Sequence, residues 1–301
     1  MSIVVSNISK KFGEQKALNN ISFTINKNEI VGFLGPNGAG KSTTMKIITG
    51  YLAPDSGMVQ VGGVAVTPDN TATKQKIGYL PEANPLYVDM YAREYLSFIA
   101  GIHHITDSKK RVEEVILLVG LSPEVHKKIG ELSKGYKQRV GIAAALIHDP
   151  EVLILDEPTS GLDPNQIIEI REVIKKLGEQ KTILFSSHIM QEVEALCKRV
   201  VIINKGNIVA DDLLSNLQKG NTESHFVSVQ FKESLDKKDF SGIKDCFAIR
   251  AVEHSTFIFE TNHPEQVRKQ LLALSIEKNL NIISLNSEKQ HLEAIFKTLT
   301  Q

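Results

Sequence analysis

Tryptophan is absent from this sequence of 301 residues, and cysteine nearly so, with only Cys197 and Cys246. Two cysteines cannot build a disulfide framework and are typical of small buried side chains in a reducing, cytosolic setting. No apolar run approaches the ~18 residues that a bilayer-spanning helix needs. The N-terminal segment also lacks the long apolar core of a signal peptide. We therefore expect a cytoplasmic protein that reaches a membrane only through a partner.

An excess of charge of either sign is absent as well, because 35 basic residues balance 35 acidic ones. Proteins that bind nucleic acid without a specific site usually carry a basic excess, so we expect no nucleic-acid partner. With 42% hydrophobic and 23% charged residues, the composition is that of a globular protein. The length accommodates one large domain or two modest ones.

Strand-like and helix-like segments alternate from about residue 30 to residue 203, which predicts an α/β domain with a largely parallel sheet. The wholly apolar run 152–155 is typical of a strand buried on both faces of such a sheet. The first 66 residues instead carry several strand signals in succession. Helical spacing of apolar residues is found at 41–50, 92–102, 108–119, 136–147, 166–177 and 189–197.

The pattern changes at the polar stretch 216–224 (NLQKGNTES), which predicts a linker. Beyond it we expect a small α+β domain, so that the predicted domains are 1–215 and 216–301. This second domain contains no catalytic motif. Its predicted strands are 226–231, 257–261 and 281–285, and its predicted helices are 264–273 and 288–299.

The segment GPNGAGKS fits the phosphate-binding pattern G-x-x-x-x-G-K-[ST], between a predicted strand and a predicted helix. Glycines let backbone N–H groups converge on phosphates, and the helix N-terminus adds a field that favours anions. Lys41 should reach the β- and γ-phosphates, and Ser42 should ligate Mg²⁺. A glycine-rich turn with an incidental lysine is the plainer alternative, but the flanking strand and helix weigh against it. The predicted nucleotide-binding residues are Gly35, Pro36, Asn37, Gly38, Ala39, Gly40, Lys41, Ser42 and Thr43.

Two acids, Asp156 and Glu157, follow the apolar run 152–155. In phosphate-loop folds the first acid after such a strand holds the metal, so Asp156 is a predicted Mg²⁺ ligand. Glu157 is placed to polarise the attacking water as a general base, a role worth about 10²–10⁴-fold. Alone, the two acids would be better interpreted as solvated residues at a strand end. Together with the phosphate loop they predict a nucleoside triphosphatase.

The segment LSKGYKQR at 132–139 lies between these motifs and resembles the signature sequence of ABC ATPases, usually written LSGGQ. SGLD at 160–163 is similar to the D-loop of that family. These motifs keep the family order, and the resemblance covers about residues 2–210. It implies the ATP-binding subunit of an ABC transporter, with a mixed sheet, N-terminal antiparallel strands and a helical subdomain at about 85–150.

The resemblance also implies roles for single residues. His188 matches the switch histidine and joins Glu157 as a predicted catalytic residue. Phe12 matches the aromatic position that stacks on adenine, although taken alone it would more often be a core residue. Ser133 and Gly135 match the signature residues that meet phosphate, and Asp163 matches the D-loop aspartate; all three are predicted nucleotide-binding residues.

Three positions depart from the family pattern. Glu82 in IGYLPE stands where the family commonly has glutamine; a carboxylate keeps an oxygen acceptor but adds charge. We expect Glu82 near the metal and interpret the change as a subgroup feature of bacterial exporters rather than as inactivating. Lys134 and Tyr136 replace the third and fifth signature residues, while Ser133 and Gly135 are retained.

The resemblance implies that ATP is held by the phosphate loop of one copy and closed over by Ser133 and Gly135 of a second. The expected partners are therefore a second ABC ATPase subunit, in a homodimer, and a membrane-spanning transporter subunit. The segment 82–91 would contact the latter, which places the protein at the inner face of the cell membrane. By length and by the block from 132 to 166, the chain is most similar to ATP-binding subunits of exporters associated with gliding motility.

Two other functions stay open. One is a soluble ABC ATPase that acts on ribosomes or nucleic acid. Such proteins usually carry two nucleotide domains or a coiled-coil insertion, whereas only about 50 residues separate Glu82 from Ser133. The other is a module that binds nucleotide without hydrolysis, against which Glu157 and His188 argue.

Overall fold

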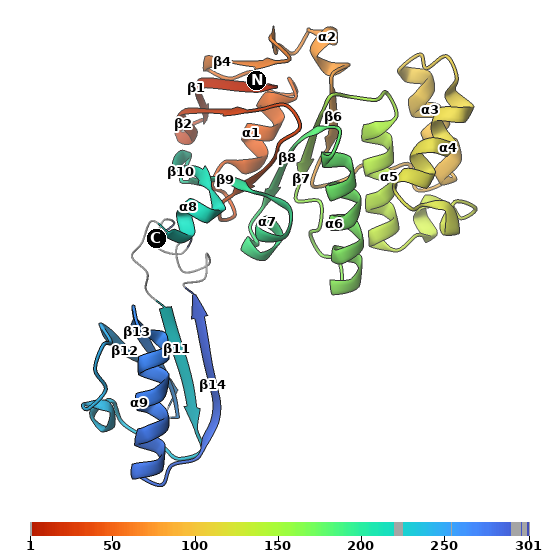
Figure 1. Cartoon of the computed structure of the whole chain (residues 1–301). Coiled ribbons are helices and arrows are strands. Elements are labelled where there is room, and N and C mark those ends of the chain that lie inside the picture. Colours follow the sequence, from red (N-terminus) through yellow and green to blue (C-terminus); the bar gives the residue numbers. More distant parts are fainter. Residues whose placement is uncertain (1, 220–224, 254, 290–295, 297–299, 301) are drawn as a thin grey trace. The chain divides into compact units, whose positions relative to one another are not determined.

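The computed structural model describes residues 2–219, 225–253, 255–289, 296 and 300 (Figure 1). The chain divides into two compact units, Met1–Leu214 and Ser215–Leu299. No helix among the described residues is long and apolar enough to cross a membrane.

A six-stranded sheet forms the centre of the first unit. Five of its strands are parallel, and the sixth, β10, pairs antiparallel with β9 through a hairpin. This confirms the predicted α/β fold with a largely parallel sheet. The strands lie in the order β10 (Asn207–Leu213), β9 (Arg199–Asn204), β3 (Ile30–Leu34), β8 (Thr182–Ser187), β7 (Val152–Asp156) and β6 (Ile77–Leu80).

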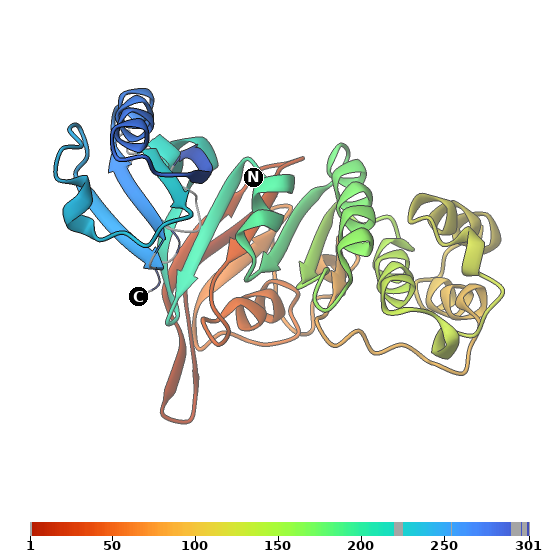
Figure 2. The same ribbon diagram turned by 90° about the horizontal axis from the view of Figure 1, so that it is seen from below.

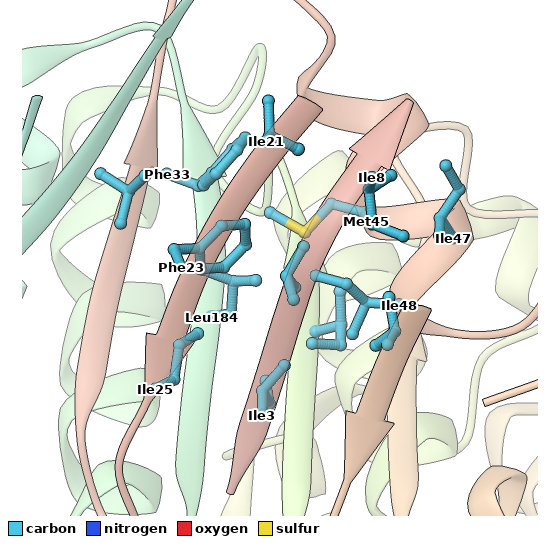
Figure 3. Close-up of a cluster of buried hydrophobic side chains, with 14 of the residues drawn as sticks. Ile3, Ile8, Ile21, Phe23, Ile25, Phe33, Met45, Ile47, Ile48 and Leu184 are labelled. Atoms are coloured by element: carbon cyan, nitrogen blue, oxygen red, sulfur yellow. The ribbon is translucent and has the colours of Figure 1, made fainter. Parts of the chain in front are cut away.

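A second, antiparallel sheet is built from the N-terminal strands, as expected from the resemblance. Helix α1 (Lys41–Ile48) lies between the two sheets, and side chains from all three elements form one apolar core (Figure 3). Phe23 and Phe33 meet in this core with ring centroids 5.4 Å apart. The strand order of the antiparallel sheet is β2 (Gln15–Ile25), β1 (Ile3–Phe12), β4 (Ser56–Val61) and β5 (Val64–Ala65).

Helices α3, α4 and α5 pack against one another on the side of the unit far from the antiparallel sheet (Figure 2). Two helices begin with a side-chain cap from a predicted site residue: Ser133 caps α5, and Asp163 caps α6. The helices of this unit are α2 (Thr71–Lys74), α3 (Ala92–Ile102), α4 (Ser108–Leu118), α5 (Lys134–Leu146), α6 (Pro164–Gly178) and α7 (Met190–Leu196), with 3-10 turns η1 (Ser122–Glu124) and η2 (Ile129–Glu131).

The second unit is an antiparallel four-stranded sheet with one long helix, which confirms the predicted α+β character. Aromatic side chains fill its core: the ring of Phe240 lies 4.5 Å from that of Phe257 and 5.2 Å from that of Phe259. The strand order is β12 (Ala248–Glu253), β13 (Thr256–Thr261), β11 (His225–Phe231) and β14 (Ile282–Lys289), with helices α8 (Leu214–Lys219) and α9 (Pro264–Glu277) and the 3-10 turn η3 (Lys237–Phe240).

Three local predictions for the C-terminal part differ from the structure. The predicted linker begins inside α8, so its first residues are helical. The predicted helix 288–299 is wrong at its start, because β14 continues to Lys289 by pairing with β11; the rest of that segment lies almost entirely outside the described residues. Strand β12 was not predicted, since Arg250 interrupts its apolar pattern and the pairing with β13 supplies what the local sequence lacks.

Candidate active site

The phosphate loop joins β3 to α1, and close contacts require glycine at two of its positions, Gly35 and Gly40. A Cβ at Gly35 would lie 2.4 Å from the backbone oxygen of Ile203, a distance that no methyl group tolerates. At Gly40 the φ angle is 112°, and a Cβ would lie 2.8 Å from the backbone oxygen of Ala17. The loop therefore keeps its path only with glycine at these two positions.

The Lys41 side chain is buried and folds back along the loop. Its Nζ donates to the carbonyl of Gly35 at 2.9 Å and to that of Pro36 at 3.3 Å. The same nitrogen lies 3.2 Å from Oε1 of Glu157, and both side chains are less than a tenth exposed. The structure thus brings the predicted phosphate-binding cation and the predicted general base into direct contact.

The two acids at the end of β7 are fixed from the neighbouring strand β8. Asp156 Oδ1 accepts a hydrogen bond from Ser186 Oγ at 2.6 Å, and the backbone N–H of Glu157 donates to the same hydroxyl at 2.9 Å. Glu157 has a φ of 49°, in the left-handed region that few residues other than glycine adopt. Such conformations persist where the surrounding structure holds them, often at functional sites.

His188 follows β8 and faces Glu157. Its Nδ1 donates to Glu157 Oε2 at 2.8 Å, and its side chain is 41% exposed whereas that of Glu157 is 7% exposed. The three side chains of Lys41, Glu157 and His188 therefore form a continuous polar chain from the phosphate loop to the solvent.

Lys41 and Glu157 line a cavity of about 380 Å³, whereas Asp156 and His188 are not among its lining residues. Phe12, half-exposed near the tip of the β1–β2 hairpin, lines the cavity together with parts of the phosphate loop and two of the predicted carboxylates, Glu82 and Glu157. Gln15 and Ala17 also contribute, and sequence reasoning missed them because no motif covers the hairpin. The lining residues are Phe12, Gln15, Ala17, Asn37, Gly38, Gly40, Lys41, Ser42, Thr43, Glu82 and Glu157.

Other predicted residues lie elsewhere in the chain's own fold. Ser133 and Gly135 line a separate small cavity together with Gln166. The Ser133 hydroxyl caps α5 by accepting from the backbone N–H of Tyr136 at 3.4 Å, and Asp163 caps α6 by accepting from that of Gln166 at 2.9 Å. One copy of the chain therefore does not bring its signature residues to the cavity of its own phosphate loop.

The polar groups around the cavity fit a magnesium ion in the presence of phosphate. Among the described residues no group of three or more acidic, cysteine or histidine side chains could hold a metal by itself. Mg²⁺ commonly uses one or two carboxylates and completes its shell with water and phosphate oxygens. Ser42 and Glu82 line the cavity, and Asp156 ends β7 immediately before Glu157, so the three offer that kind of donor set.

Tyr79 is a residue near this site that no motif singles out. It lies on β6, and its buried hydroxyl has no hydrogen-bond partner among the described residues. Burial, and then the negative charges of Asp156 and Glu82, raise the pKa of the Tyr79 phenol. The phenol therefore stays neutral at every pH at which the protein would work.

The fold and this cavity define a phosphate-loop nucleoside triphosphatase. Comparison with known proteins identifies the family within that class. Residues 18–160 match the protein family described as "ABC transporter". The chain is 37% identical to the linearmycin resistance ATP-binding protein LnrL of Bacillus subtilis over 98% of its own length and 96% of that protein. It is 34% identical to the bacitracin transport ATP-binding protein BcrA of Bacillus licheniformis, over 99% and 96% respectively.

Solved structures agree. The ATP-binding subunit of an ABC transporter aligns with a TM-score of 0.66 and 28% identity, over 73% of this chain and 93% of that one. The cassette MJ0796, solved as a dimer in a post-hydrolysis state with ADP and phosphate, aligns with a TM-score of 0.64 and 27% identity, over 70% and 98%. The chain belongs to the family of ABC transporter ATP-binding proteins. It is an ATPase that hydrolyses ATP to energise transport.

Proposed function

We propose that Glu157 is the general base of ATP hydrolysis in this chain and that His188 holds it in place. The observation that carries this proposal is the polar chain of Lys41, Glu157 and His188, with contacts of 3.2 and 2.8 Å beside the phosphate loop. Glu157 takes a proton from the water whose oxygen attacks the γ-phosphorus, while the bond to the β-phosphate oxygen breaks and ADP leaves. His188 keeps the carboxylate oriented toward that water.

The other predicted site residues complete the binding of ATP. Lys41 neutralises the β- and γ-phosphates, the backbone of residues 35–43 surrounds them, and Phe12 stacks on the base. Ser42, Asp156 and Glu82 would hold Mg²⁺, which neutralises phosphate charge when it is bound. Support for this assignment comes from the cavity, which includes Phe12, Lys41 and Glu82.

A second copy is required to close the site. Ser133 and Gly135 line a separate cavity from that of their own phosphate loop, so they are available to meet the γ-phosphate held by a partner's loop. Asp163 would act with them on the partner's nucleotide. The dimeric form of MJ0796 supports this arrangement. ATP then favours the closed pair, and hydrolysis removes the contact that favours closure.

The nucleotide-binding domain, 1–215, delivers this motion to a membrane-spanning exporter subunit through the surface near residues 82–91. An exposed aromatic group on and before α3 supports such a contact: the ring of Tyr87 lies 5.9 Å from that of Tyr95 and 5.8 Å from that of Phe98. Tyr87 and Phe98 are both exposed. The protein would then act at the inner face of the cell membrane.

The relatives point to export of antibiotic-type compounds, since two of them are named for linearmycin resistance and bacitracin transport. The predicted link to gliding motility stays a prediction, and neither of these names supports it. Copurification with a multi-span membrane protein is expected. Copurification with ribosomes or nucleic acid would instead favour the alternative of a soluble ABC ATPase.

The Glu157→Gln variant tests the proposed base directly. Glutamine keeps the size of the side chain but cannot accept a proton, so we expect turnover to fall by about 10²–10⁴-fold while ATP still binds. Steady-state phosphate release and ATP titration measure the two properties separately. Turnover within a few-fold of the unsubstituted protein would refute the assignment of Glu157.

The C-terminal domain, 216–301, is proposed to stabilise the dimer or regulate it. Its separate core, the absence of a catalytic motif in its sequence and the absence of a metal-binding cluster among its described residues motivate this role. Deletion of residues 216–301 should weaken dimerisation or change the ATPase rate. If dimerisation, rate and assembly with the transporter all stay unchanged, the domain has neither role.

A further inference from the structure

A buried hydrogen-bonded cluster joins the two chain segments that carry Glu157 and His188. Its centre is Glu192 in α7, which is only 1% exposed. Glu192 Oε1 accepts from Thr159 Oγ1 at 2.5 Å, and Oε2 accepts from Ser187 Oγ at 2.6 Å. Neither hydroxyl residue lines the cavity of the phosphate loop, so the cluster has no contact with nucleotide there.

The two hydroxyls of the cluster belong to residues that are close in sequence to Glu157 and His188. Thr159 follows Glu157 by two residues, and Ser187 immediately precedes His188. Consecutive side chains of a strand point to opposite faces, so Ser186 reaches the acids at the end of β7 while Ser187 reaches Glu192. One carboxylate in α7 thus fixes the segments on both sides of the 2.8 Å contact between Glu157 and His188.

The strength of these contacts follows from burial. A carboxylate taken out of water is tolerated only when it is well hydrogen-bonded, and short O–H···O⁻ bonds are among the stronger ones in proteins. The Ser187 hydroxyl also accepts from the backbone N–H of Ile189 at 2.9 Å, which fixes the turn that displays His188. Loss of Glu192 would release this hydroxyl and that of Thr159 together.

We propose that Glu192 is a positioning residue for ATP hydrolysis. Its carboxylate holds the segments that carry Glu157 and His188 in fixed positions relative to each other. This inference rests on the roles proposed above for those two residues. Phosphate binding depends on the loop at 35–43, which is outside the cluster. Loss of Glu192 should therefore lower kcat and leave the KM for ATP nearly unchanged, because the misplaced groups act on the attacking water and not on binding.

The test compares Glu192→Leu, Glu192→Gln and a matched control, Thr182→Val, in the full chain. Thr182 is 2% exposed and lies at the opposite end of β8, where its hydroxyl accepts from the backbone N–H of Asn28. We expect Glu192→Leu to lower kcat by about 10²-fold, as for small misplacements of reacting groups, with KM changed by less than about threefold. Thr182→Val should lower the melting temperature without lowering kcat selectively in this way.

Glutamine at 192 can still bond both hydroxyls, since each can accept as well as donate, so Glu192→Gln should recover most of the rate that leucine loses. Thr159→Val and Ser187→Ala each remove one hydrogen bond to Glu192, and each should cause part of the fall in kcat. These two variants also decide the question if Glu192→Leu does not fold.

Equal kinetics for Glu192→Leu and Thr182→Val would overturn the inference. A rise in the KM for ATP with kcat unchanged would overturn it as well. Glu157→Gln is measured in the same series. If it keeps turnover, the proposed base is wrong whatever Glu192 does. If it loses turnover while the cluster variants behave like the control, the base is right and only the positioning role fails.

Discussion

At the scale of single residues, Lys41 contacts both the phosphate loop and the buried carboxylate of Glu157. Its Nζ binds two loop carbonyls and lies 3.2 Å from Glu157, so it stabilises a buried carboxylate, and it is also the cation that we propose meets phosphate. Removing one partner of a buried ion pair is strongly destabilising, because the other charge stays out of water. Substitution at Lys41 is therefore expected to affect both stability and binding.

We predict that Lys41→Ala weakens ATP binding by at least about tenfold, as expected for loss of a charged hydrogen bond of about 1.5–3 kcal/mol. The matched control is Lys46→Ala, on the same helix but exposed to solvent. Titration with ATP and Mg²⁺ measures the affinity, and thermal unfolding measures the cost of leaving Glu157 without its partner. Equal affinity in the two variants would contradict the role of Lys41.

Much of the site could be predicted from the sequence because its chemistry is local. A loop that surrounds phosphate needs glycines and a lysine at fixed spacing, and Gly35 and Lys41 show that requirement directly. Glu192 could not be found in this way. Its importance depends on α7 packing beside β8, and no spacing in the sequence indicates that Thr159 and Ser187 meet one carboxylate.

At the scale of elements, a pair of histidines connects α3 with the turn before β7. His103 ends α3 and His148 follows α5, and their rings stack with centroids 4.1 Å apart. The Nε2 of His148 donates to the backbone oxygen of Ile77 on β6 at 3.1 Å. Burial, and then His103, Lys181 and Arg111, lower the pKa of His148 to about 4, against the opposing effect of the Ile77 carbonyl.

This lowered pKa predicts a loss of stability in mild acid. Between pH 6.5 and pH 4 the unfolded chain binds a proton at His148 that the folded chain does not, so the free energy of unfolding falls as the pH falls. The loss should be about 1–2 kcal/mol, since partial exposure screens the effect. His148→Gln should flatten this dependence, whereas His126→Gln, at an exposed histidine of the same unit, should not. Denaturant unfolding at pH 7 and pH 4.5 measures both.

Elements whose pattern is strong were predicted with nearly correct bounds, and those that depend on pairing were not. The predicted strand 152–155 is buried at every position, as β7 requires. Glu288 shows the opposite case, because a segment with helical spacing continues as a strand once Phe226 offers it a partner. Tertiary pairing decides the state of a sequence whose local preference is weak.

At the scale of the whole molecule, the site is divided between two places in one chain. The phosphate loop, Glu157 and His188 are joined by direct contacts, whereas Ser133 and Gly135 line another cavity. The resemblance predicted this division, and the fold shows why it holds: the signature begins α5 within the helical group, and the loop begins α1 between the two sheets. A second copy is the simplest way to complete the site.

The most direct measurement is the molar mass of Glu157→Gln by light scattering, with and without ATP and Mg²⁺. We predict the mass of one chain without nucleotide and twice that mass with ATP. Adding Ser133→Asp, which keeps a capping side chain at α5 but places negative charge near phosphate, should prevent the doubling. A protein that stays at the mass of one chain with ATP and yet hydrolyses it in the unsubstituted form would contradict the account.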